Sequence, residues 1–299
     1  MTSVKEFYQP HQEDIWRLPG FRESLLSVPY IQQVRTFYAN IGDEELLRKV
    51  FSIYLEEAQA TLNLLTYDCW EKGKTLLEVG GGLGLVYGFL RSRGFDICSI
   101  EPSKGAFAGF YAAGRELLRY LKIDQGRWHC LSVKECSPMN QRFDIIFSHN
   151  VFEHVSDPSE TLAVLRQMLK PNGKMLHRTV NYFIPYDPHF RILLFPWWPQ
   201  MSCILNPRLK ENLVWREINF VTAQQIKKIC DAQHLKIQFE RDAFWETFTR
   251  LANDPEFTAR HPTFYRLYHF LKKNLLLKFL TSLPPEFLTP MKFTITLKD

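Results

Sequence analysis

The stretch that decides the fold is Glu78-Val-Gly-Gly-Gly-Leu-Gly84, which joins a short apolar run, Thr75–Val79, to a helical pattern, Leu83–Arg93. Glycines at a strand-to-helix turn allow a tight bend and let backbone N–H groups approach a bound molecule closely. The dinucleotide-binding spacing G-x-G-x-x-G/A fails here, because its third position would be Leu85 in one register and Tyr87 in the other. The loop therefore excludes the nicotinamide fingerprint, and its pattern is E-x-G-x-G-x-G.

Strand and helix patterns alternate outward from this loop. Helices are predicted over residues 104–121, after an Asp157 cap, and after a Thr222–Gln225 capping box. Further strands are predicted at Phe95–Ile100, Trp128–Val133, Phe143–Ser148, Lys174–Val180, Leu235–Phe239 and Met291–Lys298. Alternation with short turns is typical of a parallel sheet covered on both faces. The sequence predicts an α/β fold with a doubly wound, Rossmann-like sheet of seven strands, most of them parallel.

Three segments flank or interrupt this core. Residues 1–43 are interpreted as a helical N-terminal extension, and residues 44–299 as the main domain, whose first helix is predicted from an Asp43 cap to about Trp70. Residues 181–221 hold five of the chain's 17 prolines and many aromatic side chains. Because ligands in open α/β sheets bind outside the carboxyl ends of the strands, this insert after the fifth strand is expected on the substrate side.

Composition excludes several classes of protein. The chain has 299 residues, of which 45% are hydrophobic and 23% charged, so it is neither disordered nor fibrous. Its net charge of +5 is small, and a nucleic-acid partner is not expected because such proteins usually carry a broad basic surface. Six cysteines without a C-x-x-C pair, and no apolar signal core at the N-terminus, predict a reduced, cytoplasmic protein. No metal site is predicted.

Four motifs in order carry a family resemblance. The E-x-G-x-G-x-G loop, followed by Ser99-Ile-Glu-Pro-Ser103, resembles the first motifs of class I S-adenosylmethionine-dependent methyltransferases. The block from Phe143 to Pro158, with its Glu-His-Val-Ser-Asp-Pro ending, is similar to that of the subgroup containing ubiquinone-biosynthesis O-methyltransferases. Leu169-Lys-Pro-Asn-Gly-Lys-Met175 matches the L-K-P-G-G turn of the same subgroup. The resemblance covers about residues 74–181.

The resemblance implies S-adenosylmethionine as cofactor. A carboxylate at the tip of the second strand can accept both hydroxyls of a ribose, a role that falls on Glu101. The residues implied to bind the cofactor are Glu78 near its methionine amino end, Gly80, Gly82, Gly84, Glu101 and Asn150. One departure is the third strand, where the family often has an acid for the adenine amine and this chain has Ser132 or Val133.

Candidate acceptor residues follow the fourth and fifth strands. A hydroxyl acceptor must lose a proton, and histidine titrates near neutral pH, so His149 and His189 are candidate general bases. The candidate substrate-binding residues are Tyr182, Tyr186, Asp187 and His189, because a few polar groups in an aromatic wall are typical of small-molecule pockets. His154 is interpreted as structural.

The resulting hypothesis is methyl transfer to an oxygen or nitrogen of a small-molecule, lipid-like or glycan-linked acceptor. The alternative is a non-catalytic binding or scaffold protein that keeps the cofactor fold. Nucleic-acid amine methylation is disfavoured because the turn after the fourth strand, Asn150-Val-Phe-Glu153, lacks the Asn/Asp-Pro-Pro-aromatic pattern. The basic helix predicted at residues 263–281 is interpreted as core-facing, with peripheral membrane contact as its alternative. The sequence carries no signal for the oligomeric state.

Overall fold

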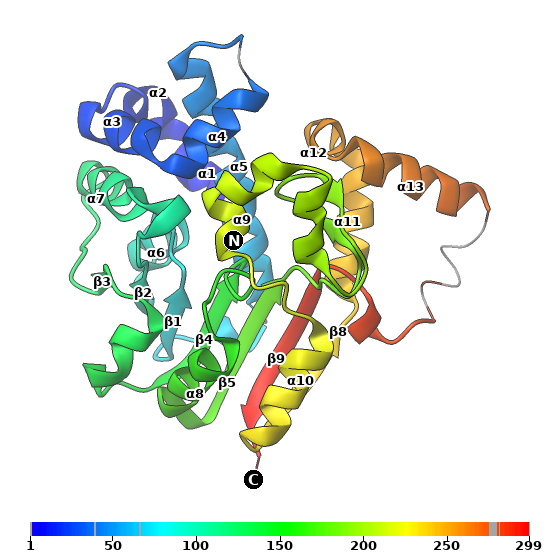
Figure 1. Cartoon of the computed structure of the whole chain (residues 1–299). Coiled ribbons are helices and arrows are strands. Elements are labelled where there is room, and N and C mark those ends of the chain that lie inside the picture. Colours follow the sequence, from blue (N-terminus) through cyan, green and yellow to red (C-terminus); the bar gives the residue numbers. More distant parts are fainter. Residues whose placement is uncertain (1, 39, 66, 275–279, 281, 299) are drawn as a thin grey trace.

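The computed structural model describes residues 2–38, 40–65, 67–274, 280 and 282–298. Within these ranges, seven strands form one sheet in the order β3-β2-β1-β4-β5-β9-β8 (Figure 1). They are β1 (Thr75–Val79), β2 (Asp96–Ile100), β3 (Trp128–His129), β4 (Phe143–His149), β5 (Leu169–Thr179), β8 (Leu235–Glu240) and β9 (Met291–Leu297). The first five strands pair in parallel, and β9 lies antiparallel between β5 and β8. The predicted mostly parallel, doubly wound sheet is confirmed.

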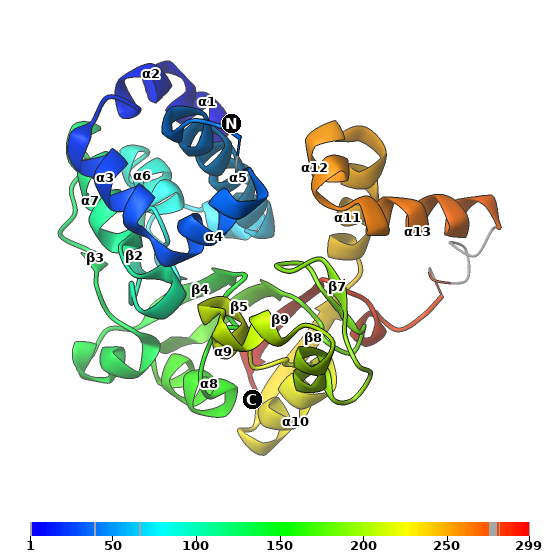
Figure 2. The ribbon, with the colours of Figure 1, turned by 45° about the horizontal axis from the view of Figure 1, so that its top comes forward.

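Helices cover both faces of the sheet (Figure 2). One face packs against α1 (Val4–Tyr8), α5 (Asp43–Leu64), α6 (Leu85–Ser92) and α7 (Phe110–Tyr120). The other packs against α8 (Pro158–Gln167), α10 (Ala223–Ala232) and the 3₁₀ helix η4 (Val133–Met139). The α8 helix keeps its predicted Asp157 cap, and α10 keeps its Thr222–Gln225 capping box.

The N-terminal helices belong to the same hydrophobic core as the sheet. Besides α1 they are α2 (Gln12–Ile15), α3 (Pro19–Ser27) and α4 (Pro29–Phe37). Tyr8 is fully buried, and its hydroxyl donates to the backbone oxygen of Leu85 over 3.0 Å. A Cβ at Gly88 would lie only 2.6 Å from that hydroxyl oxygen, so glycine at this position lets α1 pack closely on α6.

The insert, residues 181–221, folds beside the carboxyl end of β5. It contains a small hairpin of β6 (Tyr186–Asp187) and β7 (Ile192–Leu193), the 3₁₀ helices η5 (Pro199–Ile204) and η6 (Pro207–Glu211), and α9 (Leu213–Glu217). Its own buried cluster includes Tyr182, Leu209 and Trp215. Many of the aromatic residues that the sequence placed here therefore pack against one another.

Three helices near the C-terminus stand across from the N-terminal helices (Figure 2). They are α11 (Asp242–Asn253), α12 (Pro255–Arg260) and α13 (Pro262–Lys273), and η7 (Pro285–Phe287) follows them. The basic helix predicted at residues 263–281 corresponds to α13, and residues 275–279 and 281 lie outside the described residues. None of the helices in the described ranges combines the length and apolar character that a bilayer crossing requires.

Several predicted boundaries are wrong for local reasons. The helix from residue 43 ends at Leu64 instead of Trp70. At its other end the cap is Gly42 and not Asp43, whose side chain pairs with Arg35 over 2.5 Å. The predicted helix over 104–121 begins only at residue 110, after a glycine with φ of 100°. Strand β3 stops at residue 129 because Ser132 and Glu135 cap η4 just beyond it.

Candidate functional site

The glycine loop and the tip of β2 are joined through one carboxylate. Glu101 is buried, and its Oε2 accepts the N–H of Gly82 while its Oε1 accepts the N–H of Ser103, each over 2.9 Å. Burial raises the pKa of Glu101 to about 7, although both backbone hydrogen bonds lower it. The predicted ribose-binding residue is therefore fixed directly against the predicted cofactor loop.

The three glycines of the loop have different environments. Gly80, Gly82 and Gly84 adopt φ of 76°, 54° and 70°, the left-handed region that favours glycine. A Cβ at Gly80 would lie 2.4 Å from Cγ2 of Val151, which follows β4. A Cβ at Gly82 would meet no atom within 4 Å. Gly80 therefore packs against the neighbouring loop, whereas Gly82 borders open space that a ligand can fill.

Alanine substitutions at Gly80 and Gly82 should separate folding from binding. Gly80→Ala adds a clash to the left-handed strain of about 1–2 kcal/mol, so its melting temperature should fall clearly, and Val151→Ala should restore part of it. Gly82→Ala carries only the strain, so it should fold nearly normally and weaken ligand binding by filling the open space. Thermal unfolding with and without ligand measures both effects. Equal loss of stability in the two variants would contradict this assignment.

Glu78 lies beneath the same loop. Its carboxylate is buried and accepts a hydrogen bond of 2.7 Å from the Ser99 hydroxyl of β2. Burial raises the pKa of Glu78 to about 7, with the nearby charge of Glu101 adding to the rise. A Cβ at Gly81 would lie 2.2 Å from the Ser99 Oγ, so this pair packs tightly under the loop backbone. Glu78 thus supports the loop, and its contact with the methionine end of a cofactor stays a prediction.

A cavity of about 470 Å³ opens at the carboxyl ends of β4 and β5. Its walls come from α4, α5, the β6–β7 hairpin, α9 and the helices α11 to α13. Of the predicted site residues, His149, Asn150, Tyr186 and His189 line it, and Tyr182 and Asp187 are buried outside its lining. The other predicted cofactor residues, Glu78, Gly80, Gly82, Gly84 and Glu101, do not line it. The contact between Gly80 and Val151 makes the cavity and the glycine loop neighbours, since Asn150 directly precedes Val151.

His149 is held by groups of α5. Its Nδ1 lies 3.1 Å from Thr61 Oγ1 and 3.3 Å from the backbone oxygen of Glu57. Burial, together with the positive charge of Arg178, lowers the pKa of His149 to about 3. A neutral imidazole with so low a pKa is a weak base, which counts against the catalytic role predicted for His149.

His189 has the opposite electrostatic environment. Its Nδ1 lies 3.6 Å from the Asp187 Oδ1, an ion-pair distance that is too long for a hydrogen bond. Burial disfavours the charged imidazolium, but the carboxylates of Asp187 and Glu153 outweigh it, so the pKa of His189 is raised. Asp187 is itself fixed by the Tyr182 hydroxyl and the Phe190 N–H, each at 2.8 Å. The two predicted base candidates therefore differ in basicity.

The structure also brings together groups that the sequence analysis did not assign. Glu153 is fully buried beside His154 and His189, and one ligand atom from each lies within 4.8 Å of the others. Glu153 Oε1 and the Nδ1 atoms of both histidines have no hydrogen-bond partner in the described part of the chain. These donor types can hold a divalent cation, although the sequence predicted no metal site.

Arg178 is the other functional candidate that sequence reasoning missed. It lines the cavity from β5 and pairs with Glu246 of α11 over 2.6 Å. In the sequence, Arg178 is recognisable as a charged residue inside an apolar strand pattern. Glu153 was part of the quoted Glu-His-Val motif, but no role was assigned to it.

Comparisons with known proteins agree with this geometry. A family model described as a methyltransferase domain matches residues 50–238. The uncharacterized protein Rv1509 of Mycobacterium tuberculosis is 33% identical over 198 residues, which are 63% of this chain and 66% of that protein. The ubiquinone biosynthesis O-methyltransferase of Bradyrhizobium diazoefficiens is 34% identical over 109 residues, covering 36% of this chain and 41% of that enzyme.

Among solved structures, phosphoethanolamine N-methyltransferase 2 of Haemonchus contortus, in complex with S-adenosyl-L-methionine, aligns with a TM-score of 0.47. Its sequence is 16% identical, and the alignment covers 81% of this chain and 52% of that one. The chain thus spans just under two thirds of its mycobacterial relative and about half or less of the other two proteins.

Proposed function

Because the chain belongs to the methyltransferase-domain family of class I S-adenosylmethionine-dependent methyltransferases, we propose that it transfers a methyl group from S-adenosylmethionine to an acceptor oxygen or nitrogen. The observation that carries this proposal is the pairing of Glu101 with the Gly82 N–H beside open space. The proposed acceptor is a small molecule, lipid-like or glycan-linked, because the adjoining cavity of about 470 Å³ has the size and mixed lining of a small-molecule pocket.

The residues present fit the proposed cofactor. Glu101 would accept the two ribose hydroxyls, and Gly82 would leave room for the ligand next to its backbone. When bound, S-adenosylmethionine supplies a methyl group already activated by its sulfonium. The protein's own contribution is then to position the acceptor in line and to exclude water. Asn150 follows β4 and lines the cavity, and we assign it the position where cofactor and acceptor meet.

For a hydroxyl acceptor we assign the base to His189. Its unprotonated imidazole would take the acceptor proton, and the imidazolium formed would be stabilised by Asp187 and Glu153. Tyr182 and Asp187, which are buried outside the cavity lining, are positioning residues in this scheme because they fix the histidine. Tyr186 lines the cavity, so its ring is available to contact the acceptor.

Thermal unfolding with adenosyl ligands tests the proposal. S-adenosylmethionine or S-adenosylhomocysteine at about a hundred times its dissociation constant should stabilise the protein by about 2.7 kcal/mol, which is a melting shift of a few degrees. NADH should give no shift, since the loop lacks the dinucleotide spacing. An absent adenosyl shift at millimolar ligand would contradict the proposal. Tight binding without turnover on any acceptor would instead favour the non-catalytic binding protein.

A further inference from the structure

The insert carries a highly exposed apolar surface. The five most exposed large apolar side chains in the described ranges all fall between residues 193 and 205, and Trp197 is 87% exposed and Trp198 68%. They are Leu193, Trp197, Trp198, Ile204 and Leu205. Exposed apolar patches of this kind mark interaction sites in folded proteins. We call residues 193–205 the tryptophan loop.

The tryptophan loop is held in a fixed shape. The Phe195 N–H donates to the Ser202 Oγ over 3.0 Å, and the Met201 N–H donates to the Trp198 oxygen over 2.9 Å. Trp197 has φ of 64°, a left-handed conformation that bulky residues rarely adopt. Backbone strain of this kind persists where the surrounding structure imposes it, and it concentrates at ligand-binding surfaces. The loop therefore presents its indole rings to solvent as part of the fold, and they are not the side chains of a frayed segment.

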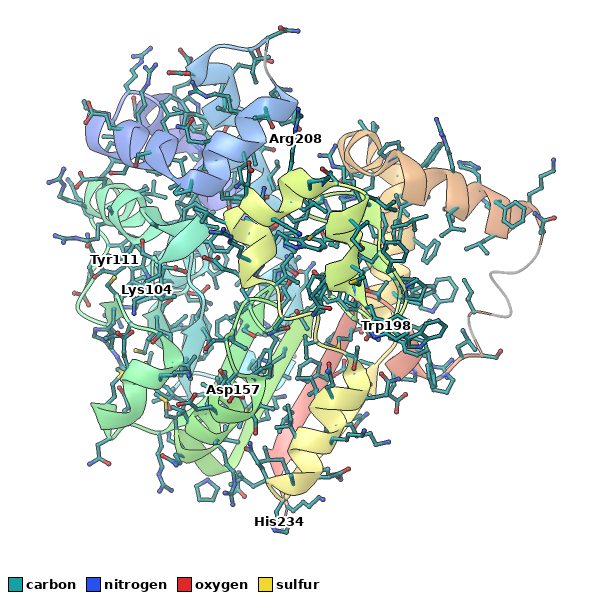
Figure 3. The ribbon with its side chains drawn as sticks, viewed as in Figure 1. Lys104, Tyr111, Asp157, Trp198, Arg208 and His234 are labelled. Atoms are coloured by element: carbon teal, nitrogen blue, oxygen red, sulfur yellow. The ribbon has the colours of Figure 1, made fainter. Side chains whose placement is uncertain are left out.

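The charged residues nearest to the loop along the chain are basic. Between Pro188 and Lys210 the chain has no aspartate or glutamate, whereas it has Arg191, Arg208 and Lys210. Figure 3 shows Arg208 well apart from Trp198, and along the chain Arg208 follows Leu205, the last residue of the loop, by three positions. An apolar, Trp-bearing surface with a basic margin is complementary to an anionic bilayer, where indole rings sit at the headgroup level. A two-fold contact between two copies would instead bring basic margins together.

We propose that the tryptophan loop docks this protein on the surface of an anionic phospholipid bilayer, with Trp197 and Trp198 at the headgroup boundary. The β6–β7 hairpin that leads into the loop also lines the acceptor cavity through Tyr186 and His189. Docking would therefore hold the cavity close to lipid-borne molecules. The inference goes beyond methyl transfer and does not depend on it, and it assigns the membrane contact to the insert instead of residues 263–281.

Vesicle sedimentation tests the docking surface. Wild-type protein should sediment with vesicles of mixed phosphatidylcholine and phosphatidylglycerol, and less with phosphatidylcholine alone. The Trp197→Ser/Trp198→Ser variant should bind the mixed vesicles at least about tenfold more weakly, because two indole rings no longer leave water. Trp245→Ser, which removes a half-exposed tryptophan of α11, is the matched control and should bind like wild type. All three proteins should keep their melting shift with S-adenosylhomocysteine, which shows that each of them is folded.

Three results would overturn the proposal. Wild-type protein that stays in solution with both kinds of vesicle has no such surface. Loss of binding in Phe270→Ser, with normal binding by the double tryptophan variant, would place the contact on α13, where Phe270 is 59% exposed. If wild-type protein is a dimer that does not bind vesicles, and the double variant is a monomer, the tryptophan loop is instead a contact between two copies of this chain. Because the ligand-induced melting shift is measured separately, failure of docking stays distinguishable from failure of the proposed methyl transfer.

Discussion

Replacing Glu101 with alanine is expected to weaken S-adenosylmethionine binding by about a hundredfold or more. The carboxylate is the proposed acceptor for both ribose hydroxyls, and hydrogen bonds to a charged group contribute about 1.5–3 kcal/mol each. The variant also leaves the N–H groups of Gly82 and Ser103 without their present partner, so the loop itself should loosen. Calorimetric titration with S-adenosylhomocysteine measures the affinity directly.

The control for this experiment is on the same strand. Asp96 begins β2 at its opposite end and pairs there with Arg127, so Asp96→Ala removes an acid without touching the loop. It should change stability slightly and leave the affinity unchanged. Glu101→Gln, which keeps the size but loses the charge, should fall between wild type and Glu101→Ala. Unaltered binding in Glu101→Ala would remove the ribose role from this residue.

Replacing His189 with alanine is expected to lower kcat by about a hundredfold or more on a hydroxyl acceptor, since general bases contribute about 10²–10⁴ in rate. The base works only when unprotonated, so the wild-type rate should rise with pH through the raised pKa of His189. Asp187→Asn removes a carboxylate that favours the imidazolium, which should move the midpoint of the profile to lower pH. Initial rates across the pH range provide the measurement.

His149 is the matched histidine for this test. It lines the same cavity, but its pKa of about 3 keeps it neutral throughout the measured range. His149→Ala should therefore leave the pH midpoint in place, whatever it does to acceptor affinity. A profile that loses its rise in His149→Ala but keeps it in His189→Ala would reverse the assignment. If both variants turn over normally, neither histidine is the base.

The sequence was most informative where the relevant residues are close in the chain. The E-x-G-x-G-x-G loop, the strand that ends at Glu101 and the α8 cap each follow from patterns within about 25 residues. The family resemblance of these local motifs also pointed to Glu101, the carboxylate that the structure joins to Gly82. The wrong predictions at this level concern element boundaries. Helix α7 begins later than predicted, after the left-handed Gly109, and η4 takes the place of the predicted end of β3.

The acceptor side depends on contacts that leave no local pattern. His149 meets Thr61 across 88 positions of the chain, and this contact with α5 accompanies the burial that makes it a weak base. The pKa of His189 is raised first by Asp187, two residues before it in the chain, and then by Glu153, which comes from a separate loop. The sequence did not rank the two histidines as bases, because the burial of His149 and the approach of Glu153 to His189 arise only in the folded chain.

By itself, then, the sequence determined the parallel sheet, the glycine loop and the acid opposite it, because hydrophobic period and turn residues are local properties. The tertiary structure alone decided the order of the last strands, with β9 between β5 and β8, and the composition of the cavity. It also decided which aromatic residues of the insert are buried and which, like Trp197, face solvent. Burial and charge proximity arise only when distant segments pack, and these two quantities set basicity and surface chemistry.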